Sequence, residues 1–291
     1  MRNAMQLKAI VKNIAKEKRI SAILVLQNYM LERFLERVSI SHYRNHFIIK
    51  GGFLIASIIG LDSRTTQDMD ATITGYPLNA DSVREMIDSI LSVPVDDHIS
   101  FTLKSIGEIR EGDEYPGFRV ALTADYEKMA VPIKLDITTG DKITPGEIEY
   151  NYKLMLEDRS ISVLAYNLPT ILAEKLETVI TRGDQNTRPR DYYDIFILTK
   201  LQWTNIDIRT LKEALRATTE KRGTAEIMRH YREIMQVVMN SDIMISRWDD
   251  YRKGFDYATE IEFGSACDTV IMIMDRLWDS DLQGDCRLYE R

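Results

Sequence analysis

Three short segments of the sequence carry the side chains that could do chemistry. The first is an apolar run that ends in two glycines, residues 47–52. The second contains Asp68 and Asp70, and the third places Asp136 inside an apolar run that resembles a strand. Side chains alternate between the two faces of a strand, so Asp68 and Asp70 point the same way. If the two strands were neighbours, three carboxylates would lie close together.

Such a carboxylate cluster needs a cation. Two unit charges ~4 Å apart repel each other by about 4 kcal/mol at an effective dielectric of 20. Mg²⁺ removes this repulsion, and it is usually held by one or two carboxylates together with substrate phosphates. Metals held in this way align the attacking and leaving oxygens of an in-line displacement at phosphorus. The acidic segments therefore predict a metal-dependent phosphoryl-transfer site.

The two glycines, Gly51 and Gly52, fit the same chemistry. They precede an expected helix over residues 53–59, and the amino end of a helix offers backbone N–H groups to phosphate. Taken singly, an Asp-x-Asp pair is often a solvated strand edge and a Gly-Gly pair is often a simple turn. Their order along the chain favours a nucleotidyltransferase.

Two residues of the second half could serve the same site. Lys175 lies at the edge of an apolar helical stripe over residues 168–179. It could neutralise the charge of a triphosphate, or it could simply lie over its apolar neighbours. Asp191 follows a loop that contains Arg188 and Arg190, and it could cap a helix or orient a basic side chain over a nucleotide. The sequence alone decides neither the role of Lys175 nor that of Asp191.

The periodicity of apolar residues divides the chain into a mixed part and a helical part. The first 40 residues have helical spacing, and Ser21 is a candidate cap for the second helix. Strands are expected over residues 47–49, 69–73, 100–109, 118–124 and 131–138, with a helix over 81–91. The last three strands have no helix between them, so we expect them to be antiparallel neighbours.

Beyond residue 166 the pattern is almost wholly helical. One helix begins around Pro169 and ends at Gly183, and further helices are expected over residues 207–219, 224–239, 241–252 and 264–279. The sequence therefore predicts an α+β fold. An N-terminal domain over residues 1–158 contains a mixed sheet with flanking helices, and an all-helical C-terminal domain covers residues 159–291.

The composition excludes several classes of protein. The 291 residues are 44% hydrophobic and 29% charged, and no apolar run approaches the ~18 residues of a membrane span. The amino terminus has no export signal, and Cys267 and Cys286 lack metal-site spacing, so we expect free thiols in the cytoplasm. The net charge of −7 argues against a protein that coats nucleic acid. A local basic surface stays open, because Lys and Arg recur along residues 182–232.

The motifs together resemble the AbiEii-type (AbiEii/AbiGii) toxins. These are nucleotidyltransferase-like proteins of type IV toxin–antitoxin and abortive-infection systems, related to the MenT-type toxins. The resemblance covers residues 45–200 best. It rests on Lys50-Gly51-Gly52, on Arg64 with Asp68 and Asp70, on Lys134 with Asp136, on Glu174-Lys175-Leu176 and on Arg190-Asp191-Tyr192-Tyr193-Asp194. It implies a DNA polymerase β-like nucleotidyltransferase sheet in the first domain.

The resemblance also implies a role for each motif. An NTP would be bound by Lys50, Gly51, Gly52, Arg64 and Lys175, and Mg²⁺ would be held by Asp68, Asp70 and Asp136. Lys134 or Asp136 would complete the second motif, and Asp191 would serve the fourth. The chain departs from the broader pattern at Gly52, where a serine is common, and in the long interval from Gly52 to Asp68.

Family members are similar to enzymes that transfer a nucleotide to the 3′ end of tRNA, which blocks aminoacylation and stops growth during phage infection. The resemblance implies an antitoxin with a winged-helix DNA-binding domain, which need not contact the toxin, and no membrane partner. Two alternatives stay open. One is a small-molecule nucleotidyltransferase of the drug-modifying kind, which the acidic charge favours. The other is an NTP-binding protein that acts without transfer, against which the three retained carboxylates argue.

Overall fold

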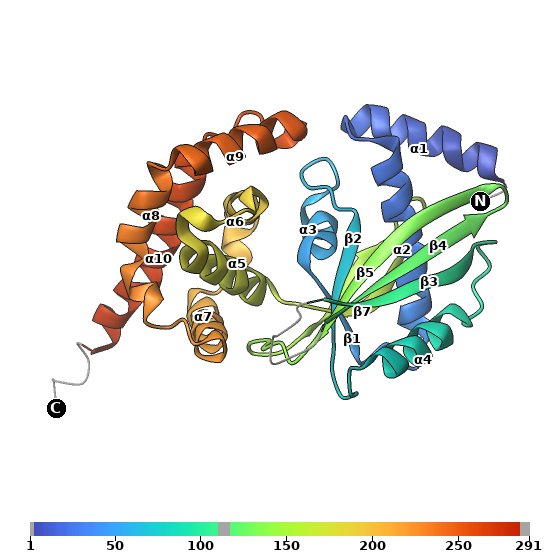
Figure 1. Ribbon diagram of the computed structural model, residues 1–291, viewed down its shortest axis with the longest axis horizontal. Helices are drawn as coiled ribbons and strands as arrows, with labels where there is room; N and C mark the ends of the chain where they lie inside the picture. Colours follow the sequence, from blue (N-terminus) through green and yellow to red (C-terminus); the bar gives the residue numbers. More distant parts are fainter. Residues whose placement is uncertain (1–2, 110–116, 286–291) are drawn as a thin grey trace. The chain divides into compact units, whose positions relative to one another are not determined.

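The computed structural model describes residues 3–109 and 117–285, and the chain divides into two compact units. The first unit comprises the residues up to 141 together with 147–166, and the second comprises 142–146 and the residues from 167 onwards. Figure 1 shows the elements of each unit. The sequence-based division between residues 158 and 159 falls between two strands of the first unit, β6 (Ile148–Lys153) and β7 (Ser160–Ala165).

The first unit is built on a mixed sheet. Its described strands follow the order β3-β4-β5-β2-β1-β7-β6. Strand β2 is parallel to β5 and β1 is parallel to β7, whereas the other neighbouring pairs are antiparallel. The antiparallel arrangement expected for the three later strands is thus confirmed. The remaining bounds are β1 Phe47–Lys50, β2 Asp68–Ile73, β3 Ser100–Ile109, β4 Gly117–Tyr126 and β5 Met129–Thr139.

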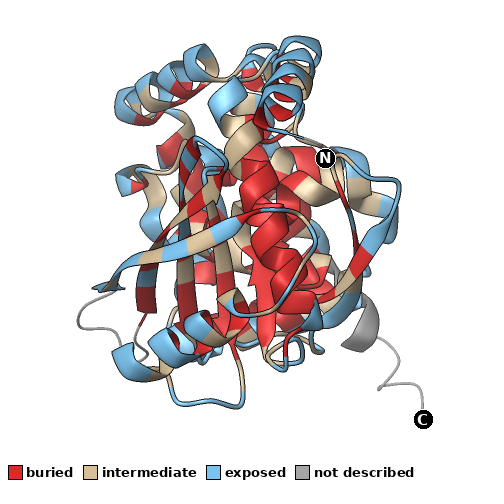
Figure 2. Ribbon diagram, turned by 90° about the vertical axis from the view of Figure 1, so that its right-hand side faces the viewer, coloured by how far each residue is buried: buried red, intermediate tan, exposed pale blue. Residues whose placement is uncertain are grey.

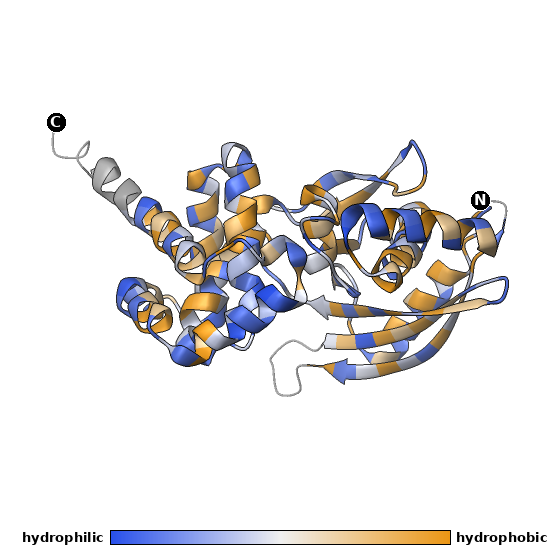
Figure 3. Ribbon diagram, turned by 90° about the horizontal axis from the view of Figure 1, so that it is seen from above, coloured by the Kyte–Doolittle hydropathy of each residue, from blue (hydrophilic) through white to orange (hydrophobic). Residues whose placement is uncertain are grey.

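Four helices flank this sheet: α1 (Ala4–Lys18), α2 (Ala22–Ile40), α3 (Gly51–Ile59) and α4 (Ala80–Leu91). As predicted, Ser21 caps α2, where its side chain accepts a hydrogen bond from the backbone N–H of Ile23. Helix α2 packs against β5 and β7 and forms much of the buried centre of the unit (Figure 2). Buried residues alternate with more exposed ones along most of β5. Figure 3 shows hydrophobic and hydrophilic residues alternating along strands of the sheet.

The second unit is helical. Asn167 caps its first helix by accepting a hydrogen bond from Thr170 N at 2.8 Å, and Pro169 occupies the first turn. The expected helix over 224–239 is instead a short 3-10 turn, Ile227–His230, followed by a shorter α-helix. The bounds are α5 Leu168–Arg182, α6 Pro189–Gln202, α7 Ile208–Arg222, α8 Tyr231–Met239, α9 Asp242–Gly254 and α10 Phe263–Asp285.

These helices enclose their own core. Helix α5 packs against α6 and α7, and α10 packs against α6 and α8. Cys267 on α10 is a buried free thiol, whereas Cys286 lies outside the described residues. Within residues 3–109 and 117–285, no helix has the length and apolar character needed to cross a membrane.

Candidate active site

Charged residues lie in one row across four neighbouring strands of the sheet. Lys50 on β1 is the register partner of Asp70 on β2. Asp70 is in turn the partner of Asp136 on β5, and Asp136 is the partner of Arg119 on β4. Direct register partners project to the same face of a sheet. Strands β2 and β5, which carry Asp70 and Asp136, are neighbours, which is the condition under which the sequence predicts a carboxylate cluster.

A second row lies one step along the same face. Asp68 on β2 is the register partner of Lys134 on β5, and Lys134 is exposed. Thr66 precedes the strand and donates a hydrogen bond from Oγ1 to Asp68 Oδ1 at 3.0 Å. This contact orients the Asp68 carboxylate. No sequence pattern singled out Thr66, because its contact with Asp68 depends on how the loop before β2 folds back.

The two glycines begin the first turn of α3, directly after β1, and both are closely surrounded. Gly51 has φ +65°, and a Cβ added there would lie 2.0 Å from Asp70 Oδ2. A Cβ at Gly52 would lie 3.0 Å from Thr66 Oγ1 and 3.1 Å from an Arg64 Nη2 atom. The absence of side chains thus lets the Asp70 carboxylate approach the amino end of α3. Partial positive charge at a helix amino end stabilises a nearby anion.

Lys50 is buried and held by residues from the end of β5. Its ammonium donates to Thr138 Oγ1 at 2.8 Å and forms an ion pair with Asp141. Thr138 Oγ1 also lies 2.8 Å from Asp141 Oδ2. These contacts fix the position of β1 just before the Gly51–Gly52 turn. Asp141 was not among the predicted site residues, because it follows the expected strand and no motif marks it.

Arg119 binds the third carboxylate of the row. Its Nε and Nη2 donate to the two oxygens of Asp136 at 2.8 and 2.6 Å. The hydrogen bond to Asp136 is the largest influence on the pKa of the Arg119 guanidinium, which is raised further by the charges of Asp68 and Asp70. Arg119 therefore lies in the field of all three carboxylates. Sequence reasoning missed it, because Arg119 fits the alternation of β4 as an ordinary exposed residue between the buried Phe118 and Val120.

The residues around Asp68 and Asp70 fit a divalent cation. Both side chains project to one face of β2 and both offer hard oxygen ligands, and the missing side chain of Gly51 lets the Asp70 carboxylate reach the amino end of α3. In the described part of the chain, no three side chains of the ligating types are arranged to hold a metal ion together. Asp136, the third predicted metal ligand, is instead paired with Arg119 through both of its carboxylate oxygens.

The predicted residues of the second unit form a compact charge cluster. The ammonium of Lys175 on α5 lies 2.9 Å from Asp191 Oδ1 and 2.7 Å from Asp194 Oδ2 on α6. Burial acts most strongly and would lower the pKa of Lys175, but the two carboxylates together outweigh it and raise the pKa. Arg188 Nε lies 3.1 Å from Asp191 Oδ2. Asp191 therefore orients basic side chains, and Arg188, not Asp191, occupies the cap position of α6.

Many basic residues of the second unit are engaged by carboxylates. Arg216 pairs with Glu220, Arg222 with Glu177 on α5, and Arg232 with Asp275. Arg182 and Arg190 are exposed. The recurrent Lys and Arg of this region are therefore, in large part, ion-paired helical surfaces.

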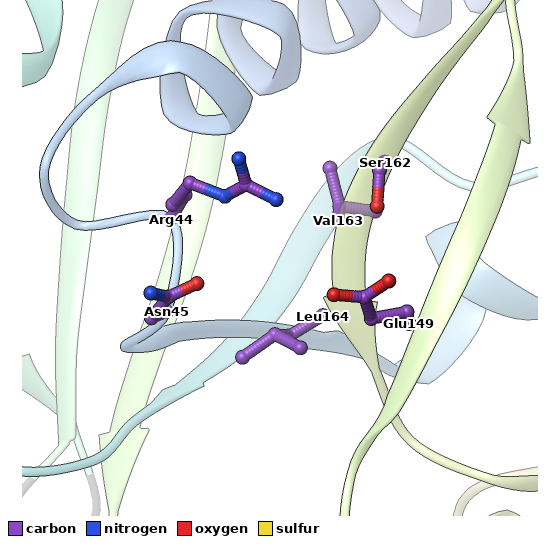
Figure 4. Close-up of a pocket in the computed structure, with 6 residues that line it drawn as sticks. All are labelled: Arg44, Asn45, Glu149, Ser162, Val163 and Leu164. Carbon is purple, nitrogen blue, oxygen red and sulfur yellow. The ribbon is translucent and has the colours of Figure 1, made fainter.

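One small hollow lies elsewhere on the first unit. Figure 4 shows the residues around it: Arg44 and Asn45 after α2, Glu149 on β6, and Ser162, Val163 and Leu164 on β7. None of them belongs to the charged rows. The hollow adds no chemistry to the carboxylate site.

The model of the family described as "Nucleotidyl transferase AbiEii toxin, Type IV TA system" matches residues 33–271. No curated protein matches the sequence.

Among solved structures, MenT4, a nucleotidyltransferase toxin from Mycobacterium tuberculosis H37Rv, aligns with 93% of this chain and 98% of its own, at 14% identity and a TM-score of 0.52. JHP933 from Helicobacter pylori aligns with 92% of this chain and 99% of its own, at 13% identity and a TM-score of 0.49. The MenT4 likeness supports the fold of a nucleotidyltransferase toxin with a helical C-terminal region. The family match extends over most of the sequence, so the chain belongs to the AbiEii nucleotidyltransferase toxin family of type IV toxin–antitoxin systems.

Proposed function

We propose that this nucleotidyltransferase toxin transfers a nucleotide from an NTP to the 3′ end of tRNA in a Mg²⁺-dependent reaction. The resulting block of aminoacylation would stop growth during phage infection, and the reaction would take place in the cytoplasm. One observation carries the proposal most directly. Asp68 and Asp70 share one face of β2, and Asp70 lies against the amino end of α3.

In this proposal the chain positions both the charge and the phosphates. Mg²⁺, when bound, would neutralise phosphate charge and favour displacement at the α-phosphorus. Asp68, oriented by Thr66, and Asp70 would hold the cation. Backbone N–H groups at Gly51 and Gly52 would bind phosphate oxygens, which the amino end of a helix favours. Lys50 and Arg64 would support this turn, since both are buried beside it.

The second unit would contribute a cation. We propose that Lys175 contacts the triphosphate and that Asp191 orients it. Support comes from the raised pKa of Lys175, which keeps the ammonium charged, and from its contacts of 2.9 and 2.7 Å with Asp191 and Asp194.

A small-molecule acceptor is the second candidate. The observation that favours it is the ion pairing of the basic residues in the second unit, because phosphate backbones are bound by Lys and Arg that are available to them. A nucleotide-binding protein without transfer is less well supported, since a protein that only binds a nucleotide would not need to keep Asp68, Asp70 and Asp136 on neighbouring strands.

A type IV toxin implies an antitoxin partner. We propose that this antitoxin carries a winged-helix DNA-binding domain and acts without a stable complex with the toxin.

The acceptor can be tested with purified protein, Mg²⁺ and each α-³²P-labelled NTP, offered to total bacterial RNA and separately to a small-metabolite extract. The tRNA proposal expects label in a tRNA-sized band from one preferred NTP. It also expects the label to disappear when the RNA is first oxidised with periodate, which destroys the 3′-terminal diol. Label confined to small metabolites would select the second candidate. Nucleotide binding without any labelled product would contradict both.

A further inference from the structure

Arg119 and Lys50 lie at opposite ends of the charged row, and the two cations differ in how firmly they are held. Lys50 is buried, and both Thr138 and Asp141 bind its ammonium. The Arg119 side chain is 48% exposed, and the contacts described for it run to Asp136 alone. The Asp136 side chain is only 14% exposed, so its carboxylate needs a cation at all times. Arg119 is therefore the cation of the row that solvent and ligands can reach, and it could leave Asp136 if another cation took its place.

The pair with Arg119 occupies both oxygens of Asp136. A bidentate guanidinium engages one lone pair of each carboxylate oxygen and adds a positive charge that repels a second cation. Asp136 is the register partner of Asp70, so it would lie next to a cation held by Asp68 and Asp70. While Arg119 is bound, Asp136 would not be available as a ligand of that cation. With Arg119 paired to Asp136, the acidic rows thus present the carboxylates of Asp68 and Asp70 on one face of β2, and the third carboxylate is masked.

A nucleoside triphosphate supplies what Arg119 would need in order to exchange partners. Guanidinium groups bind phosphate oxygens with the same bidentate geometry as carboxylates. Phosphates placed at the Gly51–Gly52 turn would lie on the same face of the sheet as Arg119, because Asp70 links the turn to the row. The incoming phosphates would then compete with Asp136 for the guanidinium.

We propose that Arg119 is a substrate-responsive counter-ion. In the nucleotide-free protein it masks Asp136, and when a nucleoside triphosphate binds it transfers to phosphate oxygens and releases Asp136 to the metal site. Full assembly of the cation site would then depend on substrate. This inference rests on the proposed function and adds to it the residue that couples nucleotide binding to cation binding.

The test is a double-mutant cycle between Arg119 and Asp136, with the Kd for Mn²⁺ measured by calorimetry in the absence of nucleotide. Arg119→Gln is expected to bind Mn²⁺ about fivefold to tenfold more tightly than wild type. Asp136→Asn alone is expected to change the affinity less than twofold, because Arg119 already masks that carboxylate. In the Arg119→Gln background, Asp136→Asn is expected to abolish the gain.

The double variant separates two effects of Arg119→Gln: the release of the Asp136 carboxylate, and the loss of a positive charge near the metal site. If the gain persisted in the double variant, removal of a positive charge alone would explain it and the proposal would be overturned. An unchanged Mn²⁺ affinity in Arg119→Gln would overturn it as well. Arg159→Gln is the matched control. Arg159 is 45% exposed and pairs with Glu36 and Glu157 away from the rows, so this variant is expected to bind Mn²⁺ as wild type does.

The nucleotide arm uses non-hydrolysable α,β-methylene analogues of the four NTPs with Mn²⁺ present. Arg119→Gln is expected to bind the preferred analogue about tenfold more weakly than wild type, although it binds Mn²⁺ alone more tightly. Equal nucleotide affinity in the two proteins would overturn the transfer of Arg119 to phosphate. Loss of transfer in Asp68→Ala together with an unchanged Arg119→Gln would refute this inference only. Normal transfer in Asp68→Ala would refute the proposed function itself.

Discussion

Gly51 and Asp70 are in such close contact that no side chain fits between them: a Cβ at Gly51 would lie 2.0 Å from Asp70 Oδ2. The turn that begins α3 and the carboxylate on β2 are therefore one structural unit. This relationship explains why the helix begins with a glycine, and it ties the proposed phosphate-binding turn to the acidic rows.

Gly51→Ala is expected to lower nucleotide transfer about 100-fold or more, because displacement of a reacting group by about 1 Å can have an effect of this size. The added methyl must push Asp70 aside, and the φ of +65° adds about 1–2 kcal/mol of backbone strain for a residue with a side chain. The measurement is the initial rate of label transfer, with circular dichroism to confirm the fold. Gly264→Ala in α10, where a Cβ has open space, is the control and should keep full activity. Similar rates for the two variants would show that the contact has no importance for the site.

Lys50→Met is expected to destabilise the protein by about 3–5 kcal/mol, because it leaves the buried Asp141 carboxylate without its cation. The free energy of unfolding from urea titration measures this loss. The double variant Lys50→Met/Asp141→Leu should recover most of it, since it removes both members of the buried pair. Without such recovery, the loss would have to come from the packing of the Lys50 side chain.

Lys175→Ala is expected to cost about 3–5 kcal/mol of stability, because Asp191 and Asp194 would remain buried without their shared cation. Urea titration again provides the value. A Lys175→Met/Asp194→Asn variant removes one charge of each sign, and its free energy of unfolding should be closer to that of wild type. If this stable variant were still fully toxic, the proposed contact of Lys175 with the triphosphate would be wrong.

Glu32 gives the protein a distinct pH dependence. Burial raises the pKa of this carboxyl from 4.5 to about 7, even though Arg33 and the N–H of Met155 bind it. The stability contributed by a group with a raised pKa is fully present below its unfolded value and is lost as the pH rises through the folded value. Between pH 4 and pH 8 the free energy of unfolding of Glu32→Gln should therefore increase by about 3 kcal/mol relative to that of wild type.

Urea titrations of both proteins across this pH range measure the change. Glu157→Gln is the control of opposite sign. Burial would raise the pKa of Glu157, but Arg159 and Arg33 together lower it. The free energy of unfolding of wild type should therefore increase relative to that of Glu157→Gln as the pH rises. A difference between Glu32→Gln and wild type that stayed constant with pH would contradict the raised pKa.

Alternation along the chain was enough to predict the central part of the sheet. Asp68 and Asp70 share a face because strands have a period of two, and the apolar residues around Asp136 marked a strand long enough to pair with β2. Strands β6 and β7 were not predicted. Residues of β6 are mostly exposed at the edge of the sheet, so they lack the apolar alternation that identifies a strand.

The partners of the charged residues could not be predicted, because they depend on register and on long-range contacts. Arg119 meets Asp136 only through the β4–β5 register. Asp141 meets Lys50 across the sheet from a position after β5, and Lys175 meets Asp194 between two helices. Residue types identified the acidic site, whereas its counter-ions needed the structure.

The most direct test of the central claim compares nucleotide transfer by wild type, Asp68→Asn and Asp70→Asn over a titration of Mg²⁺. Asp125→Asn, which changes a carboxylate at the far end of β4, is the matched control. The account predicts Mg²⁺-dependent transfer by wild type and Asp125→Asn, with a loss of about 1,000-fold or more in each of the other two, since the bound metal supplies several kcal/mol to the reaction. Transfer at the wild-type rate by folded Asp68→Asn and Asp70→Asn would contradict it.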